Sequence, residues 1–224
     1  MAKKKKRDRL NTQVIFLFIT LIAIIASFLI FSYFFNKMNE PCFDYHGFNA
    51  CAVVLPGSDI IFYSIPVNFK VGGFENQNNV VVRTDPRKVD ELGIIINVPD
   101  ILLKTRPSMM YVTMDPESNS KTVAAAYEIV KFSSNLEFPS LMAFTEDVGN
   151  NQTNVIKCEQ ATNSERVIWM KYSETEEGDE KVSSISISDY NPYCIVIESN
   201  SYDGLIEASD AFVLDWLLRI TEKK

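Results

Sequence analysis

Four cysteines are the residues whose chemistry this chain indicates most directly. Cys42 and Cys51 lie nine residues apart, and Cys158 and Cys194 each lie in a strand-like run. An even number of cysteines is typical of disulfide-bonded proteins in oxidising compartments. Pairing 42 with 51 and 158 with 194 needs no crossing of the chain; the alternative is free, buried thiols. A zinc site or another cofactor is not expected, because zinc ligands are closely spaced and His46 is the single histidine.

Side chains suited to catalysis are scarce, and we predict no catalytic residue. A serine or cysteine nucleophile needs a neighbouring base, and His46 lies in a Tyr-His-Gly turn between two cysteines that are predicted to be bridged. Carboxylate pairs can hydrolyse glycosidic bonds. The two close pairs are better interpreted as turn and capping residues: Asp115 with Glu117, and Asp203 with Glu207. Asp210 differs because it lies in an apolar helical run, where we expect a backbone N–H or an arginine to satisfy it.

Three further motifs are interpreted as surface features. Gly72-Gly73 lacks the surroundings of a phosphate-binding loop and is predicted to be a turn. The run 174–180 holds five acidic residues and predicts a solvated hairpin loop; the alternative is an acidic patch for a cation or a partner. Asn151-Gln152-Thr153 is an N-glycosylation sequon, which predicts an exposed loop at Asn151.

The N-terminal region predicts a membrane anchor. The 22 residues from Val14 to Phe35 carry no charged side chain, and a helix needs roughly 20 residues to cross a bilayer. The basic residues before this run predict a cytoplasmic N-terminus and an extracytoplasmic remainder, which is a single-pass topology. A signal peptide cleaved after Ala26 and a pilin-type N-terminus are the alternatives. The basic residues are predicted to contact lipid headgroups: Lys3, Lys4, Lys5, Lys6, Arg7 and Arg9.

The formal charge of the chain indicates which classes of binding partner to expect. The chain has 22 basic and 29 acidic residues; residues 1–40 hold 7 and 2 of them, which leaves 15 basic and 27 acidic residues beyond. The formal charge of residues 41–224 is therefore 15 − 27 = −12. Nucleic acid is not an expected partner, because binding to phosphates needs clustered lysine and arginine. The expected partners are the lipid bilayer and other envelope proteins, and the oligomeric state is open.

The secondary structure that must position these residues is predicted to be a mixture of strands and helices. Short β-branched and aromatic runs between proline and glycine turns predict strands at 50–55, 60–63, 67–71, 80–84, 94–97, 109–114, 141–145, 155–158, 167–172, 182–187 and 194–197. Asp85-Pro86 predicts the start of a short helix. Two longer helices are predicted at 121–133 and 205–220, and the second is apolar on more than one side, which predicts packing on several sides.

Strands precede a helix in both halves of the chain. We therefore expect an N-terminal transmembrane helix followed by an α+β or α/β extracytoplasmic domain, with a mixed sheet and two main helices on one face. With an offset of 83 residues, Val112–Pro116 aligns with Ile195–Ser199, which indicates an internal duplication; the alternative is chance similarity of two β-turn-α units. The predicted segments are a basic tail (1–13), an anchor (14–35), a juxtamembrane segment (36–49) and two α+β halves (50–150 and 151–224).

Motifs in the second half resemble a known group of proteins. Cys158 opens a Cys-Glu-x-Ala-Thr segment, Cys194 begins an aliphatic strand, and Ala208-Ser209-Asp210 lies in the last helix. In this order they resemble uncharacterised single-pass membrane proteins of small-genome archaea, over roughly residues 67–220. Thr84–Lys88 and Met114–Pro116 resemble earlier landmarks of that group. The resemblance implies a bridge between Cys158 and Cys194 and an extracytoplasmic location, and it implies no activity.

Two functions are compatible with these patterns. The first is a membrane-anchored extracytoplasmic domain with a structural or protein-binding role in the cell envelope. The alternative is a membrane-bound hydrolase that uses carboxylates. A cleft that holds two carboxylates of raised pKa would favour the hydrolase, whereas an exposed apolar patch or an unpaired edge strand would favour the binding domain.

Overall fold

The chain divides into two compact units, Met1–Pro41 and Cys42–Lys224. The computed structural model describes residues 19–31, 42–54, 57, 60–71, 74–149, 154–174 and 182–221, with the backbone alone at 69–71 and 74–76. The predicted headgroup contacts of the N-terminal lysines and arginines, the sequon at Asn151, the Gly72-Gly73 turn and most of the acidic loop lie outside the described residues.

The described part of the first unit is a helix at residues 19–31. At a rise of about 1.5 Å per residue, the helical residues that the structure describes account for about 20 Å, against the roughly 30 Å of a hydrocarbon core. Within the described ranges, no helix has both the length and the apolar character needed to cross a membrane. This finding overturns the prediction of a transmembrane anchor at 14–35, and with it the predicted single-pass localisation of the chain.

The second unit begins with an antiparallel four-stranded sheet. Its strands follow one another in space as they do in sequence: β1 (Cys42–Tyr45), β2 (Phe48–Val54), β3 (Ile61–Val71) and β4 (Phe74–Val82). The first turn is tight because His46 and Gly47 both have positive φ (51° and 85°), as the common two-residue hairpin turn requires. This turn sets the register that places Cys42 opposite Cys51.

A separate six-stranded sheet is built from the rest of the chain, in the order β5-β9-β10-β8-β6-β7. The four strands from β10 to β7 are parallel, while β9 is antiparallel to β10 and parallel to β5. The strands are β5 (Ile95–Asn97), β6 (Met109–Met114), β7 (Ser140–Phe144), β8 (Glu165–Tyr172), β9 (Ser183–Ser188) and β10 (Asn191–Ser199).

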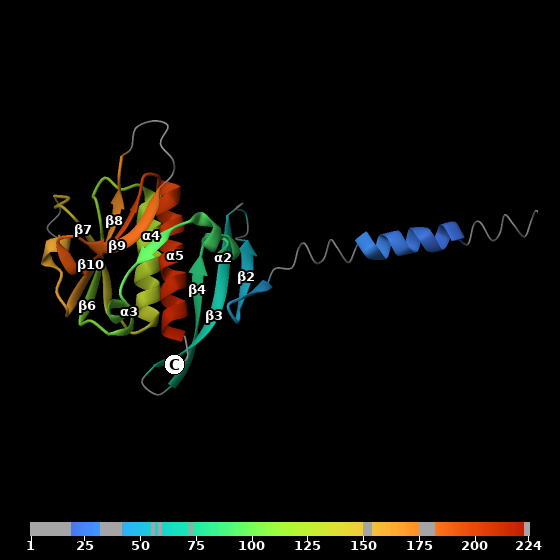
Figure 1. Ribbon diagram of the computed structural model, residues 1–224, viewed down its shortest axis with the longest axis horizontal. Helices are drawn as coiled ribbons and strands as arrows, with labels where there is room; N and C mark the ends of the chain where they lie inside the picture. The colour runs from blue at the N-terminus through green and yellow to red at the C-terminus, as the bar shows by residue number, and fades with distance from the viewer. Residues whose placement is uncertain are drawn as a thin grey trace, which may run out of the picture. The chain divides into compact units, whose positions relative to one another are not determined.

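Two long helices, α4 (Ser120–Asn135) and α5 (Tyr202–Thr221), lie between the two sheets (Figure 1). One continuous core joins the layers, with Ile65 and Val80 from the small sheet, Ile129 and Trp216 from the helices and Ile195 from the large sheet. Contact with both sheets explains the apolar stripes on several sides of α5. The short helical elements are α2 (Pro86–Val89), η1 (Asp90–Leu92), α3 (Asp100–Lys104) and η2 (Cys158–Gln160).

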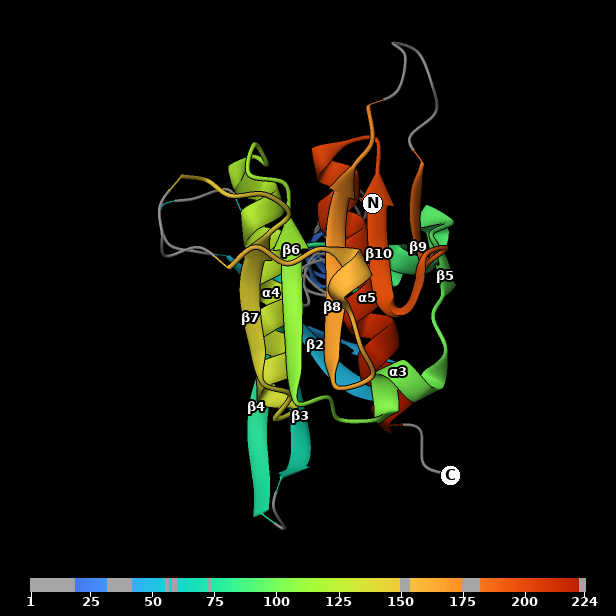
Figure 2. The same cartoon turned by 90° about the vertical axis from the view of Figure 1, so that its left-hand side faces the viewer.

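The predicted arrangement of the sheet is wrong. We expected one mixed sheet with two helices on one face, but the unit is an α+β fold in which two sheets enclose the helices. The physical reason is the short connections among the first four strands, because such turns favour pairing between sequence neighbours and so a separate antiparallel sheet. The paired strands β3 and β4 also extend beyond the end of the helical layer (Figure 2).

Candidate functional site

A cavity of about 230 Å³ lies between β4 and α4. We call it the β4–α4 pocket. Its lining comes from β3, from β4 and the residue that follows it, and from one side of α4: Phe62, Asn79, Val80, Val81, Arg83, Tyr127, Glu128, Lys131, Phe132 and Asn135. Tyr127 is 57% exposed, so the pocket has an aromatic wall that meets solvent.

The backbone of β4 faces this pocket with an unpaired edge. Among the described strands, β4 pairs with β3 alone. Asn79 lies opposite Pro66, which has no N–H to donate, and just past the strand the N–H of Arg83 donates to Asp210 rather than to β3 (3.0 Å). Because successive strand residues direct their N–H and C=O groups to alternate sides, those of Asn79 and Val81 point away from β3. Both residues line the pocket.

The other outermost strands among the described residues are shorter than β4, although β3 also has no partner on its β2 side beyond Ser64. β5 has three residues and β1 has four. The C-terminal end of β7 is paired, since Phe144 donates to the carbonyl of Asn154 and accepts from the N–H of Ile156. Short and covered edges are common protections against unwanted strand pairing. β4, with nine residues, is the longest of the outermost strands that the structure describes.

An incompletely paired ion pair lies in the pocket. Arg83 Nε is 3.0 Å from Glu128 Oε1, and the two side chains are 25% and 11% exposed. This is the distance of an ion pair without the geometry of a hydrogen bond, and Arg83 Nε has no hydrogen-bond partner among the described residues. The second carboxylate oxygen, Glu128 Oε2, is buried and also has no such partner there. The guanidinium carbon lies 5.8 Å from the centre of the Phe62 ring. Burial raises the pKa of Glu128 to about 7, the charge of Asp210 adds to this, and Arg83 opposes it.

Asp210 lies behind the pocket rather than in its lining. It is 1% exposed, and its Oδ2 accepts the backbone N–H groups of Arg83 (3.0 Å) and Thr84 (2.7 Å). The expectation that a backbone N–H satisfies this carboxylate is confirmed. Burial raises the pKa of Asp210 to about 6, although the two backbone donors and Arg83 act in the opposite direction. Of the two carboxylates with raised pKa, only Glu128 lines the cavity.

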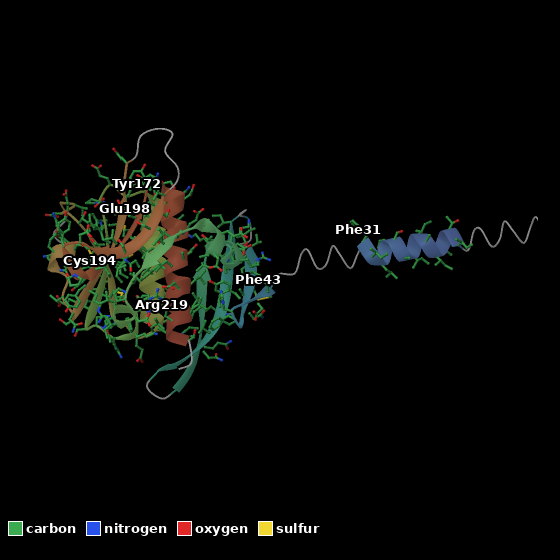
Figure 3. All side chains as sticks on the ribbon, viewed as in Figure 1. Phe31, Phe43, Tyr172, Cys194, Glu198 and Arg219 are labelled. Carbon is green, nitrogen blue, oxygen red and sulfur yellow. A yellow bond between two sulfur atoms is a disulfide. The ribbon has the colours of Figure 1, made fainter. Side chains whose placement is uncertain are left out.

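Both predicted cysteine pairs form disulfides. Cys42–Cys51 crosses the β1–β2 hairpin. Cys158–Cys194 ties η2 to β10 and belongs to a small apolar cluster apart from the main core. Figure 3 shows Cys194 in the six-stranded sheet, across the helices from Phe43 of β1. One bridge therefore lies in each of the two sheet layers of the unit, and neither contributes a residue to the lining of the β4–α4 pocket.

The remaining candidate residues lie apart from the pocket. His46 occupies the β1–β2 turn against the ring of Tyr45, with 4.7 Å between the ring centres. Asp203 pairs with Lys121 (2.6 Å). Asp115 accepts a hydrogen bond from Thr145 (2.7 Å).

A second, open cleft of about 760 Å³ lies at the carboxyl ends of β6, β7 and β8. Its lining includes five acidic residues and two stacked tyrosines: Asp115, Glu117, Glu146, Asp147, Glu174, Tyr172 and Tyr202. In Figure 3, Tyr172 and Glu198 mark this end of the large sheet. Within the described ranges, no three acidic, histidine or cysteine side chains are placed to hold a metal ion. The described part of the cleft is thus an acidic hollow at the surface.

No pattern in the sequence indicated Arg83, Glu128 or the free edge of β4 as part of a site. Glu128 lies between Tyr127 and Ile129 in the predicted helix over 121–133, and no local pattern distinguishes it from a solvent-facing glutamate. The spacing of the strands also carries no information about which edge stays open, since that depends on the order of strands in the sheet. Comparison of the chain with protein-family models, curated proteins and solved structures found no match. The resemblance to archaeal membrane proteins therefore stays a prediction.

Proposed function

We propose that the second unit is a protein-binding domain that captures an extended segment of a partner protein by strand addition to β4. The observation that carries this proposal is the unpaired edge at Asn79 and Val81, which lines the β4–α4 pocket. Strand addition uses backbone hydrogen bonds for affinity and pockets for alternate side chains for specificity. The pocket offers both parts of such a site. The edge of β4 provides backbone groups for hydrogen bonds, and α4 provides a wall of side chains opposite that edge.

The lining of the pocket suits an incoming strand. Phe62, Val80 and Phe132 provide apolar surface, and every second side chain of an extended segment points to the same face. A segment that pairs with β4 would place alternate side chains against these residues and against Tyr127. The two disulfides support an oxidising compartment as the working environment, so we expect the partner to be a protein of the same compartment.

The hydrolase alternative has less support from the geometry. A two-carboxylate mechanism needs both groups to face the substrate, whereas Asp210 binds two backbone N–H groups behind the cavity lining. Its role is to hold the end of β4. One carboxylate beside an unpaired strand edge suits recognition better than acid–base catalysis.

The test is a proline substitution at the edge. Random linear peptides are selected for binding to the full chain, and the selected peptides are measured against Val81→Pro and Val81→Ala. Because the Val81 N–H points away from β3, proline removes the edge donor without removing a β3–β4 hydrogen bond. We expect Val81→Pro to weaken binding at least about tenfold, as the loss of one or two backbone hydrogen bonds predicts, and Val81→Ala to bind as the wild type does.

Hydrogen exchange supplies the second readout. A peptide that adds to β4 slows exchange of the Asn79 and Val81 amides, and circular dichroism shows whether the proline variant keeps its fold. Equal binding by the folded proline and alanine variants would refute the proposal. So would protection that falls on another strand.

A further inference from the structure

The side chains that α4 contributes to the β4–α4 pocket lie at two depths. Tyr127, Lys131 and Asn135 are spaced four residues apart and so follow one another along one side of the helix. Tyr127 and Lys131 are exposed, and Asn135 is half-buried. Glu128 and Phe132 form a deeper row, in which the Glu128 side chain is 11% exposed and Phe132 is buried. A segment that adds to β4 therefore meets the row of Tyr127, Lys131 and Asn135 first.

The accessible charge of the pocket is positive. The lining holds two cations, Arg83 and Lys131, and one carboxylate, Glu128. Oε1 of Glu128 already pairs with Arg83, and Oε2 is buried. Lys131 is exposed, and the Arg83 side chain is 25% exposed. An incoming side chain can therefore reach the cations of the lining more readily than its carboxylate.

Lys131 has no counter-ion in the part of the chain that the structure describes. Its ammonium group belongs to none of the ion pairs found there. Burial raises the pKa of Glu128 to about 7, Asp210 adds to this, and Arg83 and Lys131 oppose it. Near neutral pH the protonated form of Glu128 is therefore populated, and in that form the lining carries two cations and no anion.

The charge of the pocket differs from that of the whole domain. Residues 41–224 carry a formal charge of −12, so the surface as a whole repels an acidic segment. This repulsion is screened beyond about 8 Å at physiological ionic strength, whereas a segment paired with β4 would lie beside Lys131. Asn79 and Asn135 add side-chain amides that can donate to a carboxylate. Charge complementarity thus favours an acidic group at this position on an otherwise acidic domain.

We infer that the β4–α4 pocket selects extended segments that carry an aspartate or a glutamate, whose carboxylate pairs with Lys131. This inference rests on the proposed strand addition to β4 and names the class of segment that it accepts. It assigns Lys131 as a residue that determines specificity. The backbone of β4 supplies affinity that does not depend on sequence.

The experiment selects random linear peptides on the full chain and compares the selected sequences with the starting library. We expect aspartate and glutamate to be enriched. One selected peptide is then synthesised twice, with its acidic residue and with the corresponding amide, and both forms are measured by calorimetry. The amide has the same shape without the charge, so the comparison isolates the carboxylate. We expect the acidic form to bind about fivefold more tightly, the upper end for a partly exposed ion pair.

Two variants separate this contact from the general charge of the domain. Lys131→Gln should bring the two forms of the peptide to within about twofold of each other. Lys88→Gln makes the same change of charge at an exposed position outside the pocket and should keep the preference. Both positions are exposed, and circular dichroism shows whether each variant keeps its fold.

The possible results differ for the two proposals. If the acidic and amide forms bind equally well while the peptide protects the β4 amides from hydrogen exchange, the inference about acidic segments is wrong and strand addition stands. Enrichment of basic or apolar residues in place of acidic ones would have the same meaning. If the preference survives in Lys131→Gln or is lost in Lys88→Gln, it does not come from the pocket, and the inference is again wrong. If no peptide is selected, or if the selected peptides protect another strand, strand addition to β4 is wrong, and the inference fails with it.

Discussion

Asp210 connects α5 to the end of β4, and the pH dependence of stability tests this connection. The carboxylate is 1% exposed, and its pKa is raised to about 6 from 3.8. Because the folded chain binds this proton more tightly than the unfolded chain, the free energy of unfolding falls as the pH rises from about 4 to about 6 and then levels off. A difference of about two pKa units corresponds to about 3 kcal/mol.

Two substitutions separate the charge of Asp210 from its role as a hydrogen-bond acceptor. Asp210→Asn keeps an oxygen for the N–H groups of Arg83 and Thr84 but cannot ionise. We expect it to match the wild type near pH 4 and to exceed it by about 3 kcal/mol at pH 7. Asp210→Ala leaves two buried donors unpaired and should lose about 2–5 kcal/mol at pH 4, where the wild-type carboxyl is neutral.

The assay is urea unfolding followed by tryptophan fluorescence, at pH steps from 4 to 8. Glu128 also has a raised pKa and contributes a slope of the same sign, so the informative quantity is the difference between the wild type and Asp210→Asn at each pH. If the difference in unfolding free energy between the wild type and Asp210→Asn stays constant from pH 4 to pH 7, Asp210 does not titrate with a raised pKa and the prediction is wrong. A stable Asp210→Ala variant at pH 4 would refute the hydrogen bonds.

Three further predictions concern the stability of the second unit. Replacing Cys158 and Cys194 by serine opens a loop of 36 residues and should lower the free energy of unfolding by about 4 kcal/mol, measured by urea unfolding beside the reduced wild type. Trp216 is fully buried and its indole N–H donates to the carbonyl of Leu103 (2.8 Å); Trp216→Phe should cost about 2 kcal/mol, and an unchanged urea midpoint would contradict this. A Cβ at Gly204 would meet three serine hydroxyls, so Gly204→Ala should destabilise by about 1–3 kcal/mol and lower the thermal midpoint, whereas an unchanged midpoint would show that the hydroxyls move aside.

The local elements of the fold could be predicted from single residues. Asn119 and Ser120 are both suited to cap the helix predicted over 121–133, and it is the side chain of Asn119 that accepts from the N–H groups of Lys121 and Thr122. Asp85 caps α2, with Pro86 in its first turn. These signals act within one turn of helix, so the sequence contains everything that they need.

The order of the layers could not be predicted in the same way. Apolar residues on several sides of 205–220 indicate packing on several sides, but they do not say whether the neighbours are helices, one sheet or two. The side chains that decide this are Ile65 and Val80, which reach the core from a sheet of their own. The predicted anchor at 14–35 is also wrong, because no helix within the described ranges has both the length and the apolar character needed to cross a membrane.

The β4–α4 pocket could not be predicted from the sequence either, because its parts meet only when the layers pack together. Arg83 and Glu128 lie 45 residues apart, and their approach depends on α4 passing beside the last strand of a four-stranded sheet. Asp210 then fixes the end of β4 from a third element, α5. An edge strand held at one end and walled by a helix is protected from indiscriminate pairing, yet its unpaired N–H and C=O groups stay available to a segment that fits the wall. The burial that leaves Glu128 short of a donor is therefore a consequence of the packing that shapes the site.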